Sequence, residues 1–119
     1  VHARGIGFPV AIVGDVVAAA AAGLTAGPGV VVWSGTGSFA VARGANGALR
    51  RTGGRGYAFG DQGGGYDVVR RALVAALLAI DGLGPRTVLT ETLTESFLAP
   101  APTRLGAAAQ ALPPREVAA

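Results

Sequence analysis

Three short stretches of the sequence carry groups that could do chemistry. Asp15 follows the apolar run FPVAIVG, and a carboxylate at the end of a buried strand can take a proton from a bound hydroxyl. SGTGS (34–38) could bind an anion through the N–H groups of a tight turn, with the hydroxyls of Thr36 and Ser38 as added donors. GGRGYAFGDQGGGYD (53–67) places glycine clusters at the start of a helix, where N–H groups and the helix dipole favour anions or sugar oxygens.

Each stretch also has a purely structural interpretation. Asp15 is a good N-cap for the helix that follows it, and position alone favours that role. SGTGS could be an ordinary hairpin turn, and it matches neither the dinucleotide fingerprint nor the Walker A loop. Asp61 could bond a ligand or cap the next helix. The third stretch does not resemble a flexible linker, because aromatic residues lie among its glycines, and its glycines predict that some group approaches the backbone there.

The first half of the chain predicts a helix and four strands. FPVAIVG (8–14) is typical of a buried strand, and VVAAAAAGL (16–24) of an alanine-rich helix. Residues 29–35 predict a second strand of the fully buried type, which turns at SGTGS and returns as FAVARG (39–44). Asn46-Gly47 then predicts a two-residue hairpin turn, in which both residues adopt positive φ, followed by the strand ALRRT. The last three strands should form an antiparallel meander.

The second half predicts helices. One begins near residues 61–65 and runs to about Asp81, with an apolar face at helical spacing, and a shorter one covers 87–98. APAPTRLG (99–106) has the composition of a linker, AAAQAL (107–112) forms at most one short helix, and PPREVAA resembles the first turn of another. The fold class is therefore α/β, without the second β-α-β unit of a doubly wound dinucleotide fold.

Composition excludes several functions. The 119 residues suffice for one modest domain, and with 50% apolar and 14% charged residues extensive disorder is not expected. There is no cysteine, which excludes disulfides, thiolate metal sites and cysteine-ligated iron–sulfur clusters within this chain, and no metal-binding residues are predicted. The one histidine, His2, is expected to be solvated rather than catalytic.

Charge and targeting signals are also informative. All ten basic residues are arginine and the pI is about 10.6, but the arginines are scattered with few aromatics between them, which argues against nucleic acid as a partner. The apolar stretch 16–33 is interrupted by Gly27-Pro28-Gly29, so no membrane span is expected, and no segment has the layout of a signal peptide. A cytoplasmic protein is expected.

The order of these motifs is more specific than any one of them. From residue 8 to 97, the chain combines GD before an alanine helix, VVVWSGTGS, an NG hairpin, RTGGRG, GDQGGGYD and a long helix ending in DGLGP. This combination resembles the N-acetylglucosamine kinase group of the BadF/BadG/BcrA/BcrD-type ATPases, in the actin-like sugar-kinase superfamily. The resemblance implies a ribonuclease-H-like fold of two lobes, with ATP and a sugar in the cleft between them.

The resemblance also assigns roles to residues. Asp15 matches the general base of in-line phosphoryl transfer, and Gly35, Thr36, Gly37 and Ser38 match the second phosphate loop. The sugar would be bound by five residues: Thr36, Gly54, Arg55, Gly56 and Asp61. ATP and Mg²⁺ are the implied cofactors, and N-acetylglucosamine or a related amino sugar is the implied substrate. A homodimer of the full-length protein is a further arrangement that we consider.

By the same resemblance, the chain covers a lobe junction. Residues 1–28 would end the first lobe, 29–99 would begin the second, and 100–119 would be a linker and the start of a truncated helix. The family's first phosphate loop would lie upstream and its adenosine-binding segment downstream, so these residues alone are expected to be inactive.

Four positions depart from the family pattern. Arg55 replaces a tryptophan, Gln62 a glutamate and Gly64 a serine, and Gly14 stands where asparagine or threonine is common. These departures bear on which sugar is bound. They leave open three alternatives: a non-catalytic sugar or nucleotide sensor, a truncated inactive fragment, and a dehydratase activator, which the absence of cysteine argues against.

Overall fold

The computed structural model describes residues 14–24 and 27–119, which form two compact units. Of these residues, unit 1 comprises 14–24, 27–33 and 39–52, and unit 2 comprises Ser34–Ser38 and Gly53–Ala119. The predicted strand at 8–14 and His2 lie outside the described residues. The assignment of chain segments to two lobes stays a prediction.

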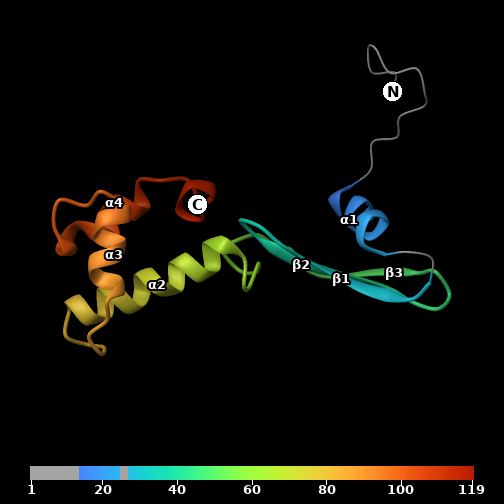
Figure 1. Cartoon of the computed structure of the whole chain (residues 1–119), viewed down its shortest axis with the longest axis horizontal. Helices are drawn as coiled ribbons and strands as arrows, with labels where there is room; N and C mark the ends of the chain where they lie inside the picture. The colour runs from blue at the N-terminus through green and yellow to red at the C-terminus, as the bar shows by residue number, and fades with distance from the viewer. Residues whose placement is uncertain (1–13, 25–26) are drawn as a thin grey trace, which may run out of the picture. The chain divides into compact units, whose positions relative to one another are not determined.

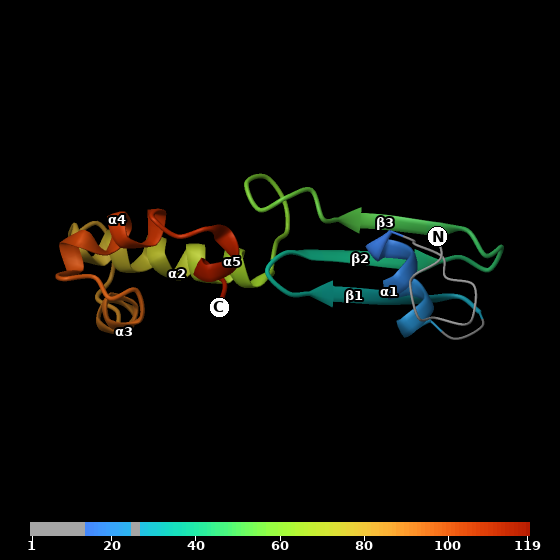
Figure 2. The same cartoon turned by 90° about the horizontal axis from the view of Figure 1, so that it is seen from above.

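Unit 1 is built on the predicted antiparallel meander. Strands β1 (Gly29–Ser34), β2 (Ser38–Arg43) and β3 (Leu49–Gly53) lie side by side in the order β1-β2-β3, with neighbouring arrows pointing in opposite directions (Figure 2). The α/β class and the three-stranded sheet are thereby confirmed.

The turn between β2 and β3 differs from the predicted two-residue type. The Gly47 N–H donates to the Gly44 carbonyl at 3.0 Å, and the Gly44 N–H donates to the Ala48 carbonyl at 3.0 Å. Of Asn46 and Gly47, Gly47 alone has a positive φ, at 79°. This is a three-residue loop, a tight turn followed by a left-handed glycine, so the prediction of positive φ at both residues was wrong.

Helix α1 (Asp15–Gly23) covers one face of the sheet. Gly23, the last residue of the helix, permits this contact, since a Cβ there would overlap the side chain of Val31. The N-cap is Gly14, and Asp15 is the first helical residue, with a carboxylate that accepts the Val16 N–H at 2.8 Å. The predicted N-cap role of Asp15 was therefore wrong by one position, because the extended backbone ends at Gly14.

Strand β1 is not fully buried, contrary to the expectation from its continuous apolar run. Val30 and Val32 are 67% and 73% exposed, and Trp33 is 54% exposed. β1 is an edge strand of this sheet, and α1 is the one described helix of unit 1. Apolar composition alone cannot distinguish a covered strand from an uncovered one.

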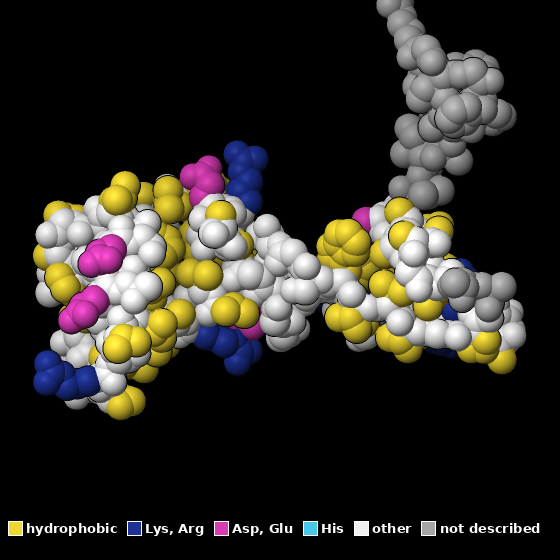
Figure 3. All heavy atoms as spheres, viewed as in Figure 1, with side chains coloured by type: hydrophobic (Ala, Val, Ile, Leu, Met, Phe, Trp, Pro, Cys, Tyr) yellow, Lys and Arg dark blue, Asp and Glu magenta, His cyan; other side chains and the backbone are white. Residues whose placement is uncertain are grey.

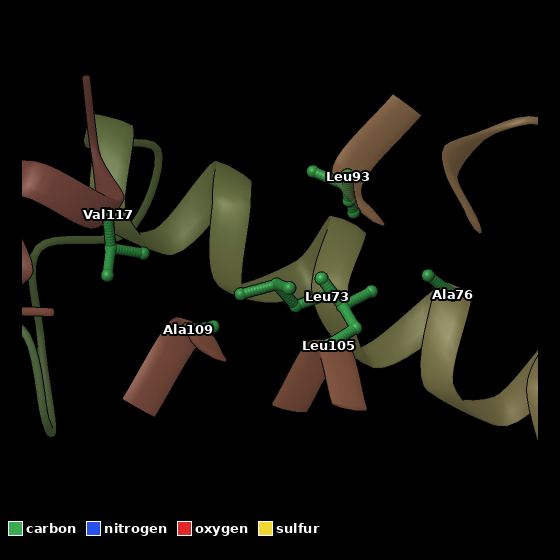
Figure 4. Packing of buried hydrophobic residues seen from close by; sticks show 6 residues of the cluster. All are labelled: Leu73, Ala76, Leu93, Leu105, Ala109 and Val117. Atoms are coloured by element: carbon green, nitrogen blue, oxygen red, sulfur yellow. The ribbon is translucent and has the colours of Figure 1, made fainter. Parts of the chain in front are cut away.

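Unit 2 is helical apart from its loops. It contains α2 (Gly65–Ile80), α3 (Leu89–Ser96), the 3₁₀ turn η1 (Pro102–Arg104), α4 (Leu105–Gln110) and α5 (Pro114–Val117) (Figure 1). The helices share one core, in which side chains from four helices point toward one another (Figure 4): Leu73, Ala76, Leu93, Leu105, Ala109 and Val117. The long amphipathic helix was predicted with nearly its observed bounds, whereas the shorter one covers 89–96 rather than 87–98.

The segment with linker composition is a packed part of unit 2. It forms η1 and the start of α4, and Leu105 within it is completely buried. A leucine and alanines at helical spacing supply a buried face despite the flanking prolines. The interpretation of 99–106 as a linker was therefore wrong.

Hydrophobic side chains also reach the surface of each unit (Figure 3). The most exposed large ones in unit 2 are Phe59 at 93% and Leu98 at 89%. Among the helices that the structure describes, none has the length and apolar character needed to cross a membrane.

Candidate functional site

The turn at SGTGS and the loop before α2 are joined into one hydrogen-bonded structure within unit 2. The Gly65 N–H donates to the Gly35 carbonyl at 2.7 Å, and the Tyr66 N–H donates to the Thr36 carbonyl at 3.0 Å. We call residues 34–38 and 61–66 together the clasp. In it, the first N–H groups of α2, which have no partner within the helix, are satisfied by the turn.

Two serine hydroxyls at the ends of the turn add hydrogen bonds to the loop. Ser34 Oγ donates to the Gly63 carbonyl at 3.1 Å, and Ser38 Oγ donates to the Gln62 carbonyl at 2.7 Å. The turn itself is closed by a bond of 2.9 Å from the Gly35 N–H to the Gly37 carbonyl. Ser38, predicted as a phosphate-binding residue, thus already uses its hydroxyl proton within the chain.

The glycines of the clasp are explained by contact between two backbones. A Cβ at Gly64 would lie 2.7 Å from the carbonyl carbon of Gly37 and 2.8 Å from the Thr36 oxygen. A Cβ at Gly37 would overlap the Asp61 carboxylate. The group that approaches the backbone at the helix start is therefore the chain's own turn, which sequence reasoning did not identify.

Thr36 has polar groups that are available to a ligand. Its side chain is exposed, and neither its N–H nor its hydroxyl has a hydrogen-bond partner in the described part of the chain. Its carbonyl, in contrast, is held by Tyr66. The backbone of Thr36 is therefore held by α2, while its N–H and side chain remain accessible.

Asp61 links the clasp to the first glycine cluster, GGRG (residues 53–56). Its Oδ1 accepts the Gly56 N–H at 3.2 Å, and its backbone adopts a left-handed conformation with φ of 58°. Gly54 and Gly56 also have positive φ, at 65° and 94°, and Arg55 packs against Gly60 while its side chain remains exposed. The alternative that Asp61 caps α2 was wrong, since the N-cap is Gly64 and no side chain bonds it.

Asp67 is a residue of this region that sequence reasoning missed. Its side chain is only 9% exposed, and its Oδ2 accepts the Gly63 N–H and Arg71 Nε, both at 3.0 Å, while Oδ1 accepts Arg70 Nη2 at 3.1 Å. The Gly63 hydrogen bond, then those from Arg71 and Arg70, lower the pKa of Asp67 from 3.8 to about 2. An acid three and four residues before two arginines was the available signal.

Asp15 lies in unit 1, beside an apolar hollow of about 340 Å³ between α1 and the sheet. The other lining residues are Ala18, Ala19, Ala22, Trp33 and Phe39. Trp33 and Phe39 are the chain neighbours of Ser34 and Ser38, so the strands that line this hollow also carry the turn. Asp15 and Thr36 belong to different units, and their convergence on a common site stays a prediction.

Known proteins resemble the chain in sequence. A 39% identity over 88 residues relates it to an N-acetylmuramic acid/N-acetylglucosamine kinase of Clostridium acetobutylicum, covering 72% of this chain and 29% of that protein. The N-acetyl-D-glucosamine kinase of Dictyostelium discoideum is 39% identical over 69 residues, which cover 58% of this chain and 22% of that protein.

A solved structure resembles it in fold. The crystal structure of a "Putative N-acetylglucosamine Kinase" from Chromobacterium violaceum matches with a TM-score of 0.69 and 29% identity, over 87% of this chain and 35% of that one. The chain therefore spans about a third or less of the length of these proteins. Residues 13–111 match the sequence profile of the BadF/BadG/BcrA/BcrD ATPase family, so the chain belongs to that family.

Proposed function

We propose that this chain is part of an ATP-dependent kinase that phosphorylates N-acetylglucosamine or a related amino sugar, N-acetylmuramic acid included. The observation that carries the proposal is the clasp, which joins the turn expected to hold phosphate to the loop expected to hold sugar. Phosphoryl transfer asks a protein chiefly to align two reactants, and a shared rigid support for both binding segments serves that purpose.

The phosphate side of the site is the turn of the clasp. The unengaged N–H and hydroxyl of Thr36 would donate to phosphate oxygens, and Gly35 and Gly37 would let those oxygens approach the backbone. The Thr36 hydroxyl is also a hard oxygen donor of the kind that Mg²⁺ prefers, so it would help to hold the ion beside the phosphates. When bound, Mg²⁺ would supply positive charge that offsets the negative charge of the phosphates.

The sugar side is the first glycine cluster with Asp61. The left-handed backbone at Gly54 and Gly56 turns the chain sharply, and Asp61 fixes this turn through the Gly56 N–H. A carboxylate that accepts one backbone bond still has lone pairs for sugar hydroxyls. The exposed Arg55 would add donors for an acetamido oxygen or a carboxylate-bearing substituent.

Asp15 is the proposed general base. It is exposed at the start of α1, beside the hollow lined by Trp33 and Phe39. In the proposed mechanism its carboxylate accepts the proton of the attacking sugar hydroxyl as the new bond from that oxygen to the γ-phosphorus forms, while the bond from the γ-phosphorus to ADP breaks and ADP leaves. Exclusion of water around the reactants would then prevent simple hydrolysis of ATP.

The test is an assay of the full-length protein for sugar phosphate, with ATP and each of N-acetylglucosamine, N-acetylmuramic acid and glucose. Phosphorylation of an N-acetylated sugar is expected, with isothermal titration showing binding of the same sugar. Absence of both heat and product with every sugar would refute the proposal.

The variant Asp15→Asn distinguishes a catalytic kinase from a non-catalytic sugar or nucleotide sensor. Removal of a general base should lower kcat by roughly 10²- to 10⁴-fold while binding of ATP and sugar changes little. Asp81→Asn is the matched control, since Asp81 lies at the far end of α2 and should not affect turnover. If wild type and Asp15→Asn bind ligand equally and neither turns over, the chain belongs to a non-catalytic binding protein.

A further inference from the structure

We propose that Asp67 is a positioning residue, which holds the turn at residues 35–37 in place by fixing the peptide of Gly63. This inference rests on the proposed function, which assigns that turn to phosphate. No role in the reaction follows from the sequence motifs for Asp67, and the residue does not face the turn directly. It acts through two successive hydrogen bonds.

The first bond fixes the loop to the helix. Asp67 is in the first turn of α2 and is the third residue after the N-cap Gly64. An acid at this position commonly reaches back to the N–H of the cap residue itself. Here Oδ2 reaches one residue further, to the Gly63 N–H at 3.0 Å, where the backbone turns with φ of 77°.

The second bond joins the loop to the turn. The carbonyl of Gly63 accepts Ser34 Oγ at 3.1 Å, so Gly63 is held by Asp67 on its N–H side and by the last residue of β1 on its carbonyl side. Gly64 follows, buried against Gly37 and Thr36. Displacement of Gly63 would therefore move the surface on which Thr36 rests.

Asp67 also forms ion pairs with two arginines. Arg70 and Arg71 approach its two oxygens from the next turn of the same helix, while their own side chains are 50% and 66% exposed. Exposed ion pairs of this kind contribute little, so we expect Asp67 to keep its bond to Gly63 without them. The bond that matters for the turn is the one to Gly63.

Two substitutions separate that bond from the ion pairs. Asp67→Ala removes both, whereas the double variant Arg70→Ala/Arg71→Ala removes the ion pairs and leaves the carboxylate facing Gly63. In the full-length protein without ligands, amide hydrogen exchange should accelerate by up to about tenfold at Gly63 in Asp67→Ala, with faster exchange also at Gly65 and Tyr66. The double variant should exchange at these amides as the wild type does.

Turnover should follow the same pattern. Because small misplacements of a binding group cost large factors in rate, kcat should fall about 10- to 100-fold in Asp67→Ala and remain near wild type in the double variant. Leu73→Ala, a core truncation on the same helix, is the control for lost stability and should leave the kcat of folded enzyme unchanged. Asp67→Asn, which keeps an acceptor oxygen, should restore most of the activity.

Equal effects of Asp67→Ala and the double variant, on exchange or on kcat, would overturn the inference. Should Asp67→Ala not fold, Asp67→Ser tests the same bond, since its hydroxyl lies one bond short of the carboxylate oxygens. If the wild type phosphorylates no sugar, the proposed function fails, and the exchange rates at Gly63, Gly65 and Tyr66 still decide whether Asp67 positions the turn.

Discussion

The two glycine clusters of unit 2 use the same residue for different physical reasons. In the first, Gly53, Gly54 and Gly56 have φ of 75°, 65° and 94°, and a Cβ at Gly56 would meet nothing within 4 Å. In the second, Gly64 has an ordinary φ of −71°, yet a Cβ there would strike the backbone of the turn. The first cluster needs glycine for conformation, as does Gly63 with its φ of 77°, whereas Gly64 needs it for space.

The difference bears on the candidate site. A cluster required for its conformation leaves its surface open to a ligand, as the exposed Arg55 and Gly56 illustrate. The space beside Gly64 is already filled by the chain's own turn. We therefore place the proposed sugar contacts at the first cluster and regard the second as the support of the phosphate turn.

The largest effect is expected from Gly64→Ala. Its Cβ would meet backbone atoms that cannot rotate away, so the clasp must open, at a cost of about 1–3 kcal/mol in the free energy of unfolding and with loss of sugar kinase activity. Urea denaturation and the kinase assay on the full-length protein measure the two effects. The control is Gly106→Ala in α4, where a Cβ would meet Leu77 at an ordinary 3.6 Å and stability should not fall.

Gly56→Ala should have a smaller effect. An alanine held at φ of 94° costs roughly 1–2 kcal/mol through backbone strain alone. Gly47→Ala is matched in conformation, with φ of 79° and no atom within 4 Å, but it lies in the hairpin of unit 1. Both should lose similar stability in thermal denaturation, and only Gly56→Ala should raise the KM for sugar. A raised KM in both would contradict the placement of the sugar contacts at the first cluster.

Ser38→Ala should weaken the clasp without opening it. Loss of the 2.7 Å bond to the Gln62 carbonyl is expected to cost about 0.5–1.5 kcal/mol, since neighbouring bonds of the clasp remain. Ser34→Ala, which loses a longer bond of 3.1 Å, should cost no more. A double-mutant cycle by urea denaturation measures whether the two losses in the free energy of unfolding are additive. Additive losses would argue against cooperation between the two bonds of the clasp.

The smallest effect is expected from protonation of Asp67, which changes the free energy of unfolding only in acid. Its pKa lies at about 2 in the folded protein against 3.8 for the free group, so its stabilisation is complete above pH 3.8 and is lost as the pH falls toward 2. Acid unfolding followed by circular dichroism should therefore show a component in this window that Asp67→Asn lacks. Identical acid profiles for the two proteins would exclude this linkage.

Much of the fold follows from local patterns. The spacing of Val69, Leu73, Leu77 and Ile80 predicts α2, because one turn of helix brings these residues to one face. The NG pair predicts the position of the second hairpin, although its closure is a three-residue loop. The burial of β1 and of Leu105 could not be predicted, since burial depends on which elements cover a segment and not on its own composition.

The candidate site divides in the same way. Sequence indicated Thr36, Asp61 and the glycine clusters, because glycine and small polar residues at a tight turn or before a helix are locally recognisable. It did not reveal that Ser38 is engaged by Gln62, or that Asp67 holds Gly63. The first of these bonds joins residues of the turn and the loop, whose pairing depends on how the two pack together.

The sequence by itself determined the family and the order of helices and strands, because periodicity and motif order are properties of the chain. The tertiary structure decided that the turn and the loop are one clasp, and that Gly64 serves a backbone contact. The physical reason is that residues about 25 to 30 positions apart can satisfy one another's N–H and carbonyl groups only after packing has brought them within hydrogen-bond distance.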